Sequence, residues 1–186
     1  MPIEPRQLAS AIDSTRLTFV HGEPRADIIE ALCREATAHG FAAVCVRLQD
    51  VMHARQCLGV HSPVALATVV GFPERKLTAE QEADYPVVGG VNTTTKFQEI
   101  CQALSEGADE LDVVMNVAYL KTDLECGGDF TRQELRGLMQ CVGDAAPIKL
   151  IIETDLLDDA QIVAATRLCA EAGVAMVKTC TGMIEG

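Results

Sequence analysis

Aromatic side chains are scarce in this sequence. Its 186 residues contain no tryptophan, two tyrosines and five phenylalanines, so aromatic residues make up only 4% of the chain. The hydrophobic fraction is nevertheless 48%, and the core must therefore be built from valine, isoleucine, leucine and alanine. A core of this kind is typical of parallel strands that are buried on both faces. A chain of this length can bury one sizeable core, so we expect a single domain over residues 1–186.

Positive charge is also in short supply. Lysine and arginine total 15 against 27 aspartate and glutamate residues, which gives a formal net charge of -12. Such an acidic chain is a poor candidate for binding nucleic acid or an anionic membrane, and any phosphate group must bind in a local pocket. No signal peptide and no apolar run of membrane-spanning length is recognisable. We therefore expect a cytoplasmic protein with no nucleic-acid or membrane partner.

Paired cysteine motifs are missing, although the chain contains eight cysteines. There is no C-x-x-C pair and no cysteine–histidine cluster with the spacing of a zinc site. Several cysteines lie inside apolar runs, for example Cys45 and Cys169. We interpret the cysteines as reduced, small core residues and expect no metal site.

Helical and strand patterns alternate along the chain. The spacing of apolar residues predicts helices, and Gly40, Gly107 and Gly173 are expected to end three of them. The predicted helices span residues 5–12, 25–39, 51–58, 94–106, 130–145 and 158–172, and Asp158 is the expected N-cap of the last. Apolar runs predict buried strands at residues 12–17, 41–46, 64–70, 110–115, 148–153 and 174–178, with a loop around Asn116 after the fourth. This alternation is typical of βαβ units around a parallel sheet.

Two α/β architectures compete for this pattern. A doubly wound sheet usually has a phosphate-binding loop after its first strand, but the chain contains neither G-x-G-x-x-G nor G-x-x-x-x-G-K-[ST]. A (β/α)8 barrel needs eight strands and roughly 200–250 residues or more. Six strands in 186 residues therefore predict a TIM-barrel type of α/β fold with about six of its eight βα units present. Residues 74–89 do not fit the alternation and are expected to form an atypical insertion at one rim.

Charged residues stand in three successive apolar strands. Asp112, Lys149 and Lys178 each lie within or at the end of a predicted strand, and lysine is among the residues least often buried. In a parallel barrel, polar residues near the carboxyl ends of the strands meet at one mouth, where the chemistry takes place. Each residue alone is as well explained by a structural ion pair, or by a lysine stem that covers apolar surface. On three successive strands, however, they together favour a catalytic site.

A lysine with no cofactor motif beside it points to Schiff-base catalysis on a carbonyl substrate. With an ordinary pKa of about 10.4, a free lysine is neutral in only about one of 2,500 molecules at pH 7. Burial and a neighbouring cation both favour the neutral amine, which is the form that attacks a carbonyl. Lys178 is the candidate nucleophile, Lys149 the candidate cation and Asp112 the candidate proton-transfer residue.

At these residues the sequence resembles a known family, the deoxyribose-phosphate aldolases. The segments that carry the resemblance are Gly107–Asn116 (GADELDVVMN), Lys149–Thr154 (KLIIET) and Ala172–Gly182 (AGVAMVKTCTG), together with Gly40–Val46, Val69–Pro73 and Asp13–Thr15. Several of these motifs occur in the expected order, and they span nearly the whole chain outside the insertion. The resemblance is therefore specific.

The resemblance implies a class I aldolase on a (β/α)8 barrel. Such an enzyme reversibly cleaves 2-deoxy-D-ribose 5-phosphate to D-glyceraldehyde 3-phosphate and acetaldehyde, in the catabolism of deoxyribose phosphates. It implies that Lys178 forms the Schiff base, that Asp112 donates and accepts protons, and that no metal or cofactor takes part. The implied lining of the substrate site is Lys149, Cys45 and Asp13, with Thr179, Thr181 and Gly182 from the loop beside the substrate phosphate.

The sequence departs from the family pattern in four places. The family continues for two more strands, which carry a second catalytic lysine and most of the phosphate-binding residues. We therefore expect a C-terminally truncated member with low or no activity on its own. The stretch at residues 74–89 interrupts a loop that the family keeps short. Arg16 and Arg47 stand where less charged residues are expected, and Cys180 replaces a usual serine.

Two other interpretations stay open. One is an inactive remnant that acts as an oligomeric or sugar-phosphate-binding protein, because a six-stranded fragment exposes two strand edges that favour self-association. The other is a related Schiff-base aldolase that acts on a different aldehyde. The expected partners are a small phosphorylated sugar or aldehyde and, where the open edges pair, further copies of the chain.

Overall fold

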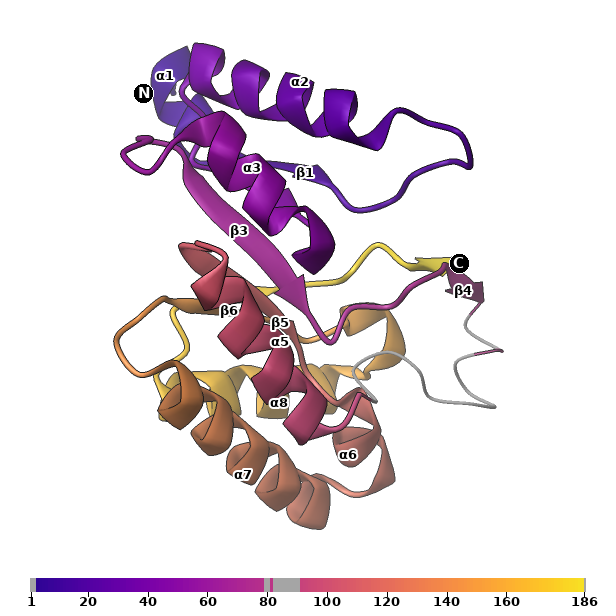
Figure 1. Ribbon diagram of the computed structural model, residues 1–186. Coiled ribbons are helices and arrows are strands. Elements are labelled where there is room, and N and C mark those ends of the chain that lie inside the picture. Colours follow the sequence, from indigo (N-terminus) through magenta and orange to yellow (C-terminus); the bar gives the residue numbers. More distant parts are fainter. Residues whose placement is uncertain (1–2, 79–80, 82–90, 186) are drawn as a thin grey trace. The chain divides into compact units, whose positions relative to one another are not determined.

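The structure is a computed structural model that describes residues 3–78, 81 and 91–185. The chain divides into two compact units, one made of residues 1–69 and 102–110 and the other of residues 70–101 and 111–186. Strands and helices alternate in both units, as the sequence predicts (Figure 1). The single domain expected over residues 1–186 stays a prediction.

The first unit is built on three parallel strands. They are β1 (Asp13–Arg16), β2 (Ala43–Val46) and β3 (Ala65–Val70), which pair in the order β1-β2-β3. Its helices are α1 (Pro5–Ala9), α2 (Arg25–His39), η1 (Leu48–Asp50) and α3 (Val51–Leu58). Helix α2 packs against α3 and β1 (Figure 1), and also against β2. It ends at Gly40 in the left-handed conformation (φ 67°), as the sequence predicts.

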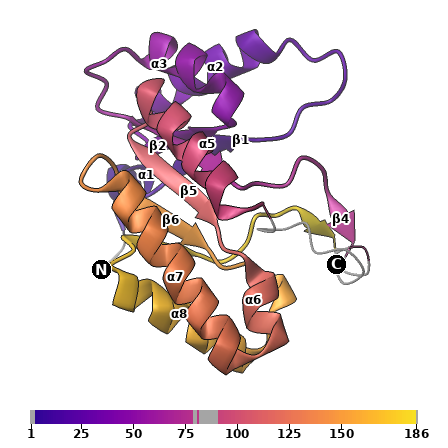
Figure 2. The same cartoon turned by 60° about the horizontal axis from the view of Figure 1, so that its bottom comes forward.

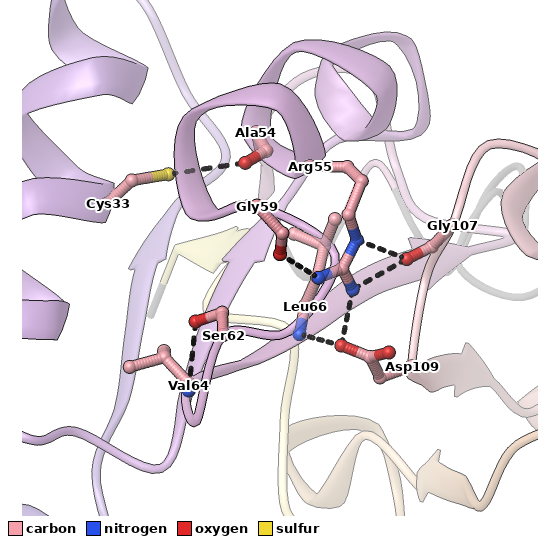
Figure 3. A network of polar contacts seen from close by, with 9 residues as sticks. All are labelled: Cys33, Ala54, Arg55, Gly59, Ser62, Val64, Leu66, Gly107 and Asp109. Atoms are coloured by element: carbon pink, nitrogen blue, oxygen red, sulfur yellow. Dashed lines mark hydrogen bonds and ion pairs between the residues drawn. The ribbon is translucent and has the colours of Figure 1, made fainter.

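A half-buried arginine joins several elements of the first unit. Arg55 of α3 donates to the carbonyl of Gly59 at 3.1 Å and, through two of its nitrogens, to the carbonyl of Gly107 at 2.9 and 2.7 Å. Its guanidinium also pairs with Asp109, whose Oδ2 accepts the backbone N–H of Leu66 at 2.8 Å (Figure 3). Gly107 has a φ of 98°, a region that favours glycine. The network fixes residues 107–109 against the start of β3.

The second unit repeats the arrangement with three further parallel strands. They are β5 (Glu110–Val114), β6 (Ile148–Ile151) and β7 (Met176–Lys178), in the order β5-β6-β7. Its helices are α5 (Thr93–Ser105), α6 (Val117–Thr122), α7 (Leu124–Val142), η2 (Thr154–Leu156) and α8 (Asp159–Ala172). Helix α7 packs against both α6 and α8 (Figure 2). Helix α8 starts at the predicted cap, Asp158, and ends at Gly173 in the left-handed conformation.

The segment between β5 and β6 differs from the sequence-based expectation. The sequence predicts a loop around Asn116 and a helix from residue 130, whereas the structure contains α6 and an α7 that already begins at Leu124. Gly127 explains the difference, because a Cβ atom there would lie 1.9 Å from the carbonyl oxygen of Tyr119. A glycine pair has a low helix propensity and therefore suggests a loop, but Gly127 is what allows α6 and α7 to touch.

Two very short strands were not expected. Strand β4 (Leu77–Thr78) pairs in parallel with β8 (Ile184–Glu185), and the N–H of Leu77 donates to the carbonyl of Met183 at 2.9 Å. Leu77 and Met183 are both buried. Strand β4 falls within the insertion expected at residues 74–89, of which residues 79, 80 and 82–89 lie outside the described part of the chain.

The core of both units is aliphatic, as the composition predicts. Fully buried side chains include Val44, Val46 and Leu66 in the first unit and Leu111, Ile148 and Leu150 in the second. Among the described residues, no helix combines the length and the apolar character needed to cross a membrane.

The cysteines are only partly the core residues that the sequence suggests. All eight are free thiols; Cys33, Cys45 and Cys169 are buried as expected, but Cys57, Cys101, Cys126 and Cys180 are exposed. The prediction is therefore wrong for these four, because helix faces and the loop after β7 carry them to the surface. Burial raises the pKa of the Cys33 thiol to about 11, with the neighbouring Cys57 as a second cause. Burial likewise raises the pKa of Cys169 to about 11.

Candidate active site

The candidate site is built on the face that β5, β6 and β7 share in the second unit. Asp112 is in register with Lys149 on β6, and Lys149 is in register with Met176 on β7. Lys178 follows Met176 by two residues, so its side chain points to the same face as theirs. All three charged residues named from the sequence therefore lie on one face of these strands.

Lys178 and Asp112 meet across the intervening strand. The Nζ atom of Lys178 donates to Oδ2 of Asp112 and forms an ion pair with it. The Asp112 side chain is fully buried, whereas 29% of the Lys178 side chain is exposed. The amine is thus accessible from solvent while it touches a group that can take or give a proton. A candidate acid–base residue has to be within hydrogen-bond reach of its partner, and Asp112 meets that condition.

Lys149 is the second cation of this face, and it is buried. It is only 6% exposed, although an ammonium group is rarely removed from water without compensation. It lies beside Asp112, one strand from Lys178, and its role as a site-lining cation stays a prediction. The three strands thus bring Lys178, Lys149 and Asp112 into one cluster.

The loop after β7 follows directly on Lys178. Thr179 and Gly182 are exposed, and Thr181 is half-buried. The backbone N–H of Ile152 donates to the carbonyl of Lys178 at 3.0 Å, and the N–H of Thr154 donates to that of Thr179 at 2.8 Å. The loop is therefore tied to the end of β6 from its first residue onward.

Two further residues of the sequence-based site belong to the first unit. Asp13 begins β1, and Cys45 lies in β2, where it is 1% exposed. The register pairs Cys45 with Thr15, two residues after Asp13, so Asp13 and Cys45 share one face of their strands. Their place in the lining of the substrate site stays a prediction.

A buried ion pair at the carboxyl end of β5 was not predicted from the sequence. Nζ of Lys96, in α5, donates to Oε1 of Glu134 and to the carbonyl of Val114, both at 2.8 Å. Oε2 of Glu134 accepts the N–H of Asn116 at 3.4 Å. Lys96 is four residues before the buried Ile100, on the same face of α5, and that spacing is the signal that could have identified it. The pair holds the carboxyl end of β5, two residues beyond Asp112.

One set of donor groups comes close enough together to hold a metal ion. Among the described residues, donor atoms of Glu153, Asp155 and Cys180 lie within 4.8 Å of one another. The carboxylate of Glu153 is already engaged by Thr181, whose N–H donates to it at 3.0 Å. The catalytic roles of Lys178 and Asp112 stay predictions.

The chain is similar over nearly its whole length to one protein family. Residues 10–185 match a model that describes DeoC/LacD family aldolases. The deoxyribose-phosphate aldolase of Clostridium kluyveri is 36% identical over 180 residues, which cover 97% of this chain and 73% of that protein. The deoxyribose-phosphate aldolase of Methanocella arvoryzae is 37% identical over 181 residues, with 97% and 71% covered.

Solved structures show the same likeness in three dimensions. A protein from Coccidioides immitis superposes with a TM-score of 0.81 at 34% identity, over 99% of this chain and 64% of that one. The tetrameric deoxyribose phosphate aldolase from Aeropyrum pernix gives 0.72 at 28% identity, over 96% and 66%. The chain thus spans about two thirds of the length of these two proteins. The likeness confirms the predicted α/β fold of the TIM-barrel type, with about six of its eight βα units.

Proposed function

Because the chain belongs to the DeoC/LacD family of aldolases, we propose that it is a Schiff-base aldolase whose nucleophile is Lys178. The observation that carries the proposal is the contact between Lys178 and Asp112, a partly exposed amine held against a buried carboxylate. An amine nucleophile needs a partner that moves protons while the carbonyl carbon changes its bonding. The contact with Lys178 supports this role for Asp112.

We propose 2-deoxy-D-ribose 5-phosphate as the substrate, because the similar curated proteins are named deoxyribose-phosphate aldolases. The products are then D-glyceraldehyde 3-phosphate and acetaldehyde, and the reaction belongs to the breakdown of deoxyribose phosphates. The same reaction needs no metal and no cofactor. Self-association and a cytoplasmic location stay predictions; the tetrameric state is a property of the Aeropyrum protein.

In the cleavage direction, Nζ of Lys178 attacks the aldehyde carbon of the open-chain sugar phosphate. The carbonyl oxygen leaves as water, and a protonated imine forms. The bond between carbons 2 and 3 then breaks as the hydroxyl on carbon 3 loses its proton, and the bonding electrons pass into an enamine. Protonation of the enamine and hydrolysis of the imine release acetaldehyde and restore the amine. Asp112 accepts and returns the protons, and Lys149 supplies positive charge to the lining.

Reductive trapping tests this assignment. Borohydride should convert the imine to a stable secondary amine, so that treatment with acetaldehyde leaves an ethyl group on Lys178, detected by peptide mass mapping. Lys121 is exposed and serves as the internal control for unselective modification. We expect Lys178 to be labelled at least about tenfold faster than Lys121, which corresponds to about 1.4 kcal/mol of preferential stabilisation.

Two outcomes would contradict the proposal. Equal labelling of Lys178 and Lys121 would show that Lys178 is an ordinary surface amine. Selective labelling that survives in Lys178→Arg, at another lysine, would assign the nucleophile elsewhere. An Asp112→Asn variant completes the design, because it keeps the shape of the side chain and should slow trapping at Lys178 without abolishing its selectivity.

A further inference from the structure

Glu153 has a backbone conformation that glycine usually supplies. It follows β6 with φ 53° and ψ 67°, in the left-handed region. Among the described residues it is the one non-glycine residue with a positive φ. A side chain in this region is strained, and such strain persists only where the surroundings enforce it. The contacts of the Glu153 side chain identify what enforces it here.

The Glu153 carboxylate is fully buried and faces the loop that follows Lys178. Its Oε1 and Oε2 accept the backbone N–H of Thr181 at 3.0 and 3.3 Å, and Oε2 also accepts the Thr181 hydroxyl. Hydrogen bonds to an ionised carboxylate are about twice as strong as those between neutral groups. Both donors of Thr181 are therefore directed at one buried anion.

Thr181 also forms a hydrogen bond with the chain that follows it. Its Oγ1 accepts the N–H of Met183 at 3.1 Å. Met183 is buried, and its carbonyl accepts a hydrogen bond from the N–H of Leu77. On the other side, Ile152 and Thr154, the two neighbours of Glu153, hold the carbonyls of Lys178 and Thr179. The loop is thus fixed at both ends, with Glu153 at the centre of the contacts.

We propose that Glu153 is a positioning residue, which holds the loop at residues 179–182 in a preformed shape for the phosphorylated end of the substrate. This inference rests on the proposed function. A buried anion would repel a phosphate group, so its role is to fix the backbone and not to bind substrate. Thr181 belongs to the same restraint: its N–H and hydroxyl are directed at Glu153, so it supports the loop and is not a direct phosphate ligand.

The test uses the full chain and three variants. Glu153→Gly removes the carboxylate but tolerates the left-handed backbone, which favours a folded protein. Thr181→Val removes the hydroxyl and keeps the N–H. Asp155→Asn is the matched control, because it removes an exposed negative charge two residues from Glu153 and leaves the restraint intact.

Hydrogen exchange measures the restraint directly, without any need for activity. We expect faster exchange in the peptide that covers residues 179–183 of Glu153→Gly, by about tenfold to a hundredfold, the range for losing hydrogen bonds to a charged group. Thr181→Val should give a smaller increase, and Asp155→Asn should match the wild type. Unchanged exchange in Glu153→Gly, with its circular dichroism spectrum intact, would overturn the inference.

Trapping at Lys178 separates this inference from the proposed function. Glu153→Gly should keep trapping by acetaldehyde within about threefold of wild type but lose about tenfold or more with deoxyribose 5-phosphate. Equal losses with both substrates would show a role that is not specific to the phosphorylated end and would overturn the inference. If the wild type is not labelled by either compound, the proposed function fails, and the exchange result still decides whether Glu153 holds the loop.

Discussion

Replacing Lys96 by methionine is the most demanding test of how the second unit is held together. The substitution keeps an unbranched side chain of similar length but removes the ammonium group that Glu134 and the Val114 carbonyl both contact at 2.8 Å. The Lys96 and Glu134 side chains are 0% and 2% exposed. The variant therefore leaves a carboxylate in the interior without its counter-ion.

The expected cost follows from that burial. Removing one partner of a buried ion pair typically destabilises a protein by about 3–5 kcal/mol, because the remaining charge is uncompensated. Domains are stable by only about 5–15 kcal/mol in total. For a chain of this size, a loss of 1 kcal/mol lowers the melting temperature by about 2–4 °C, so we expect Lys96→Met to melt about 6–20 °C lower than the wild type.

Urea unfolding followed by circular dichroism measures the effect, with two companion variants. Lys121→Met removes an exposed lysine and should change the free energy of unfolding by no more than about 0.5 kcal/mol. The double variant Lys96→Met, Glu134→Leu removes both charges and should recover most of the loss, since paired removal of a buried ion pair is often nearly neutral. A Lys96→Met protein as stable as Lys121→Met would refute the reasoning, and so would a double variant that is less stable than Lys96→Met alone.

Two glycine substitutions test how α6 packs against α7. Gly127→Ala should destabilise the chain by about 1–3 kcal/mol or more in thermal unfolding, because its Cβ would meet the backbone of Tyr119 at 1.9 Å. A Cβ atom at the neighbouring Gly128 would have nothing within 4 Å. Gly128→Ala should therefore stabilise the chain by about 1 kcal/mol through its higher helix propensity. A loss of stability as large as that of Gly127→Ala would contradict the packing argument. Burial raises the pKa of the Cys33 and Cys169 thiols from 9.0 to about 11, so iodoacetamide at pH 8 should leave both unmodified while the exposed cysteines react. Because their folded-state pKa is raised, the stability that these thiols contribute is present below about pH 9 and is lost between pH 9 and 11; urea midpoints that stay constant over this window would show the assignment to be wrong.

The sequence was most informative where one local pattern determined one element. Apolar runs located the six parallel strands, and Gly40, Gly173 and Asp158 marked helix ends that the structure confirms. These signals are local, because a left-handed cap or a capping carboxylate depends on a few neighbouring residues. The charged residues on β5, β6 and β7 were found for a similar reason, since charge is conspicuous inside an apolar strand.

The features that were missed depend on contacts between distant parts of the chain. The low helix propensity of Gly127 is visible in the sequence, while its contact with the backbone of Tyr119 is not. Lys96 resembled an ordinary polar residue on a helix, because its partner Glu134 is far away in sequence. The role of Glu153 depends on a backbone conformation and on Thr181, neither of which composition or periodicity reveals.

The short β4–β8 pair has a consequence for the order in which the chain folds. It joins segments that are separated by about a hundred residues, and closing a flexible loop of that length costs on the order of 4 kcal/mol in chain entropy. Two residues on each strand cannot offset such a cost at an early stage. Once β5, β6 and β7 have assembled, residues 110–178 are already ordered and the remaining closure is shorter. The pair therefore forms late, and it should be the first contact of the second unit to open when the native state fluctuates.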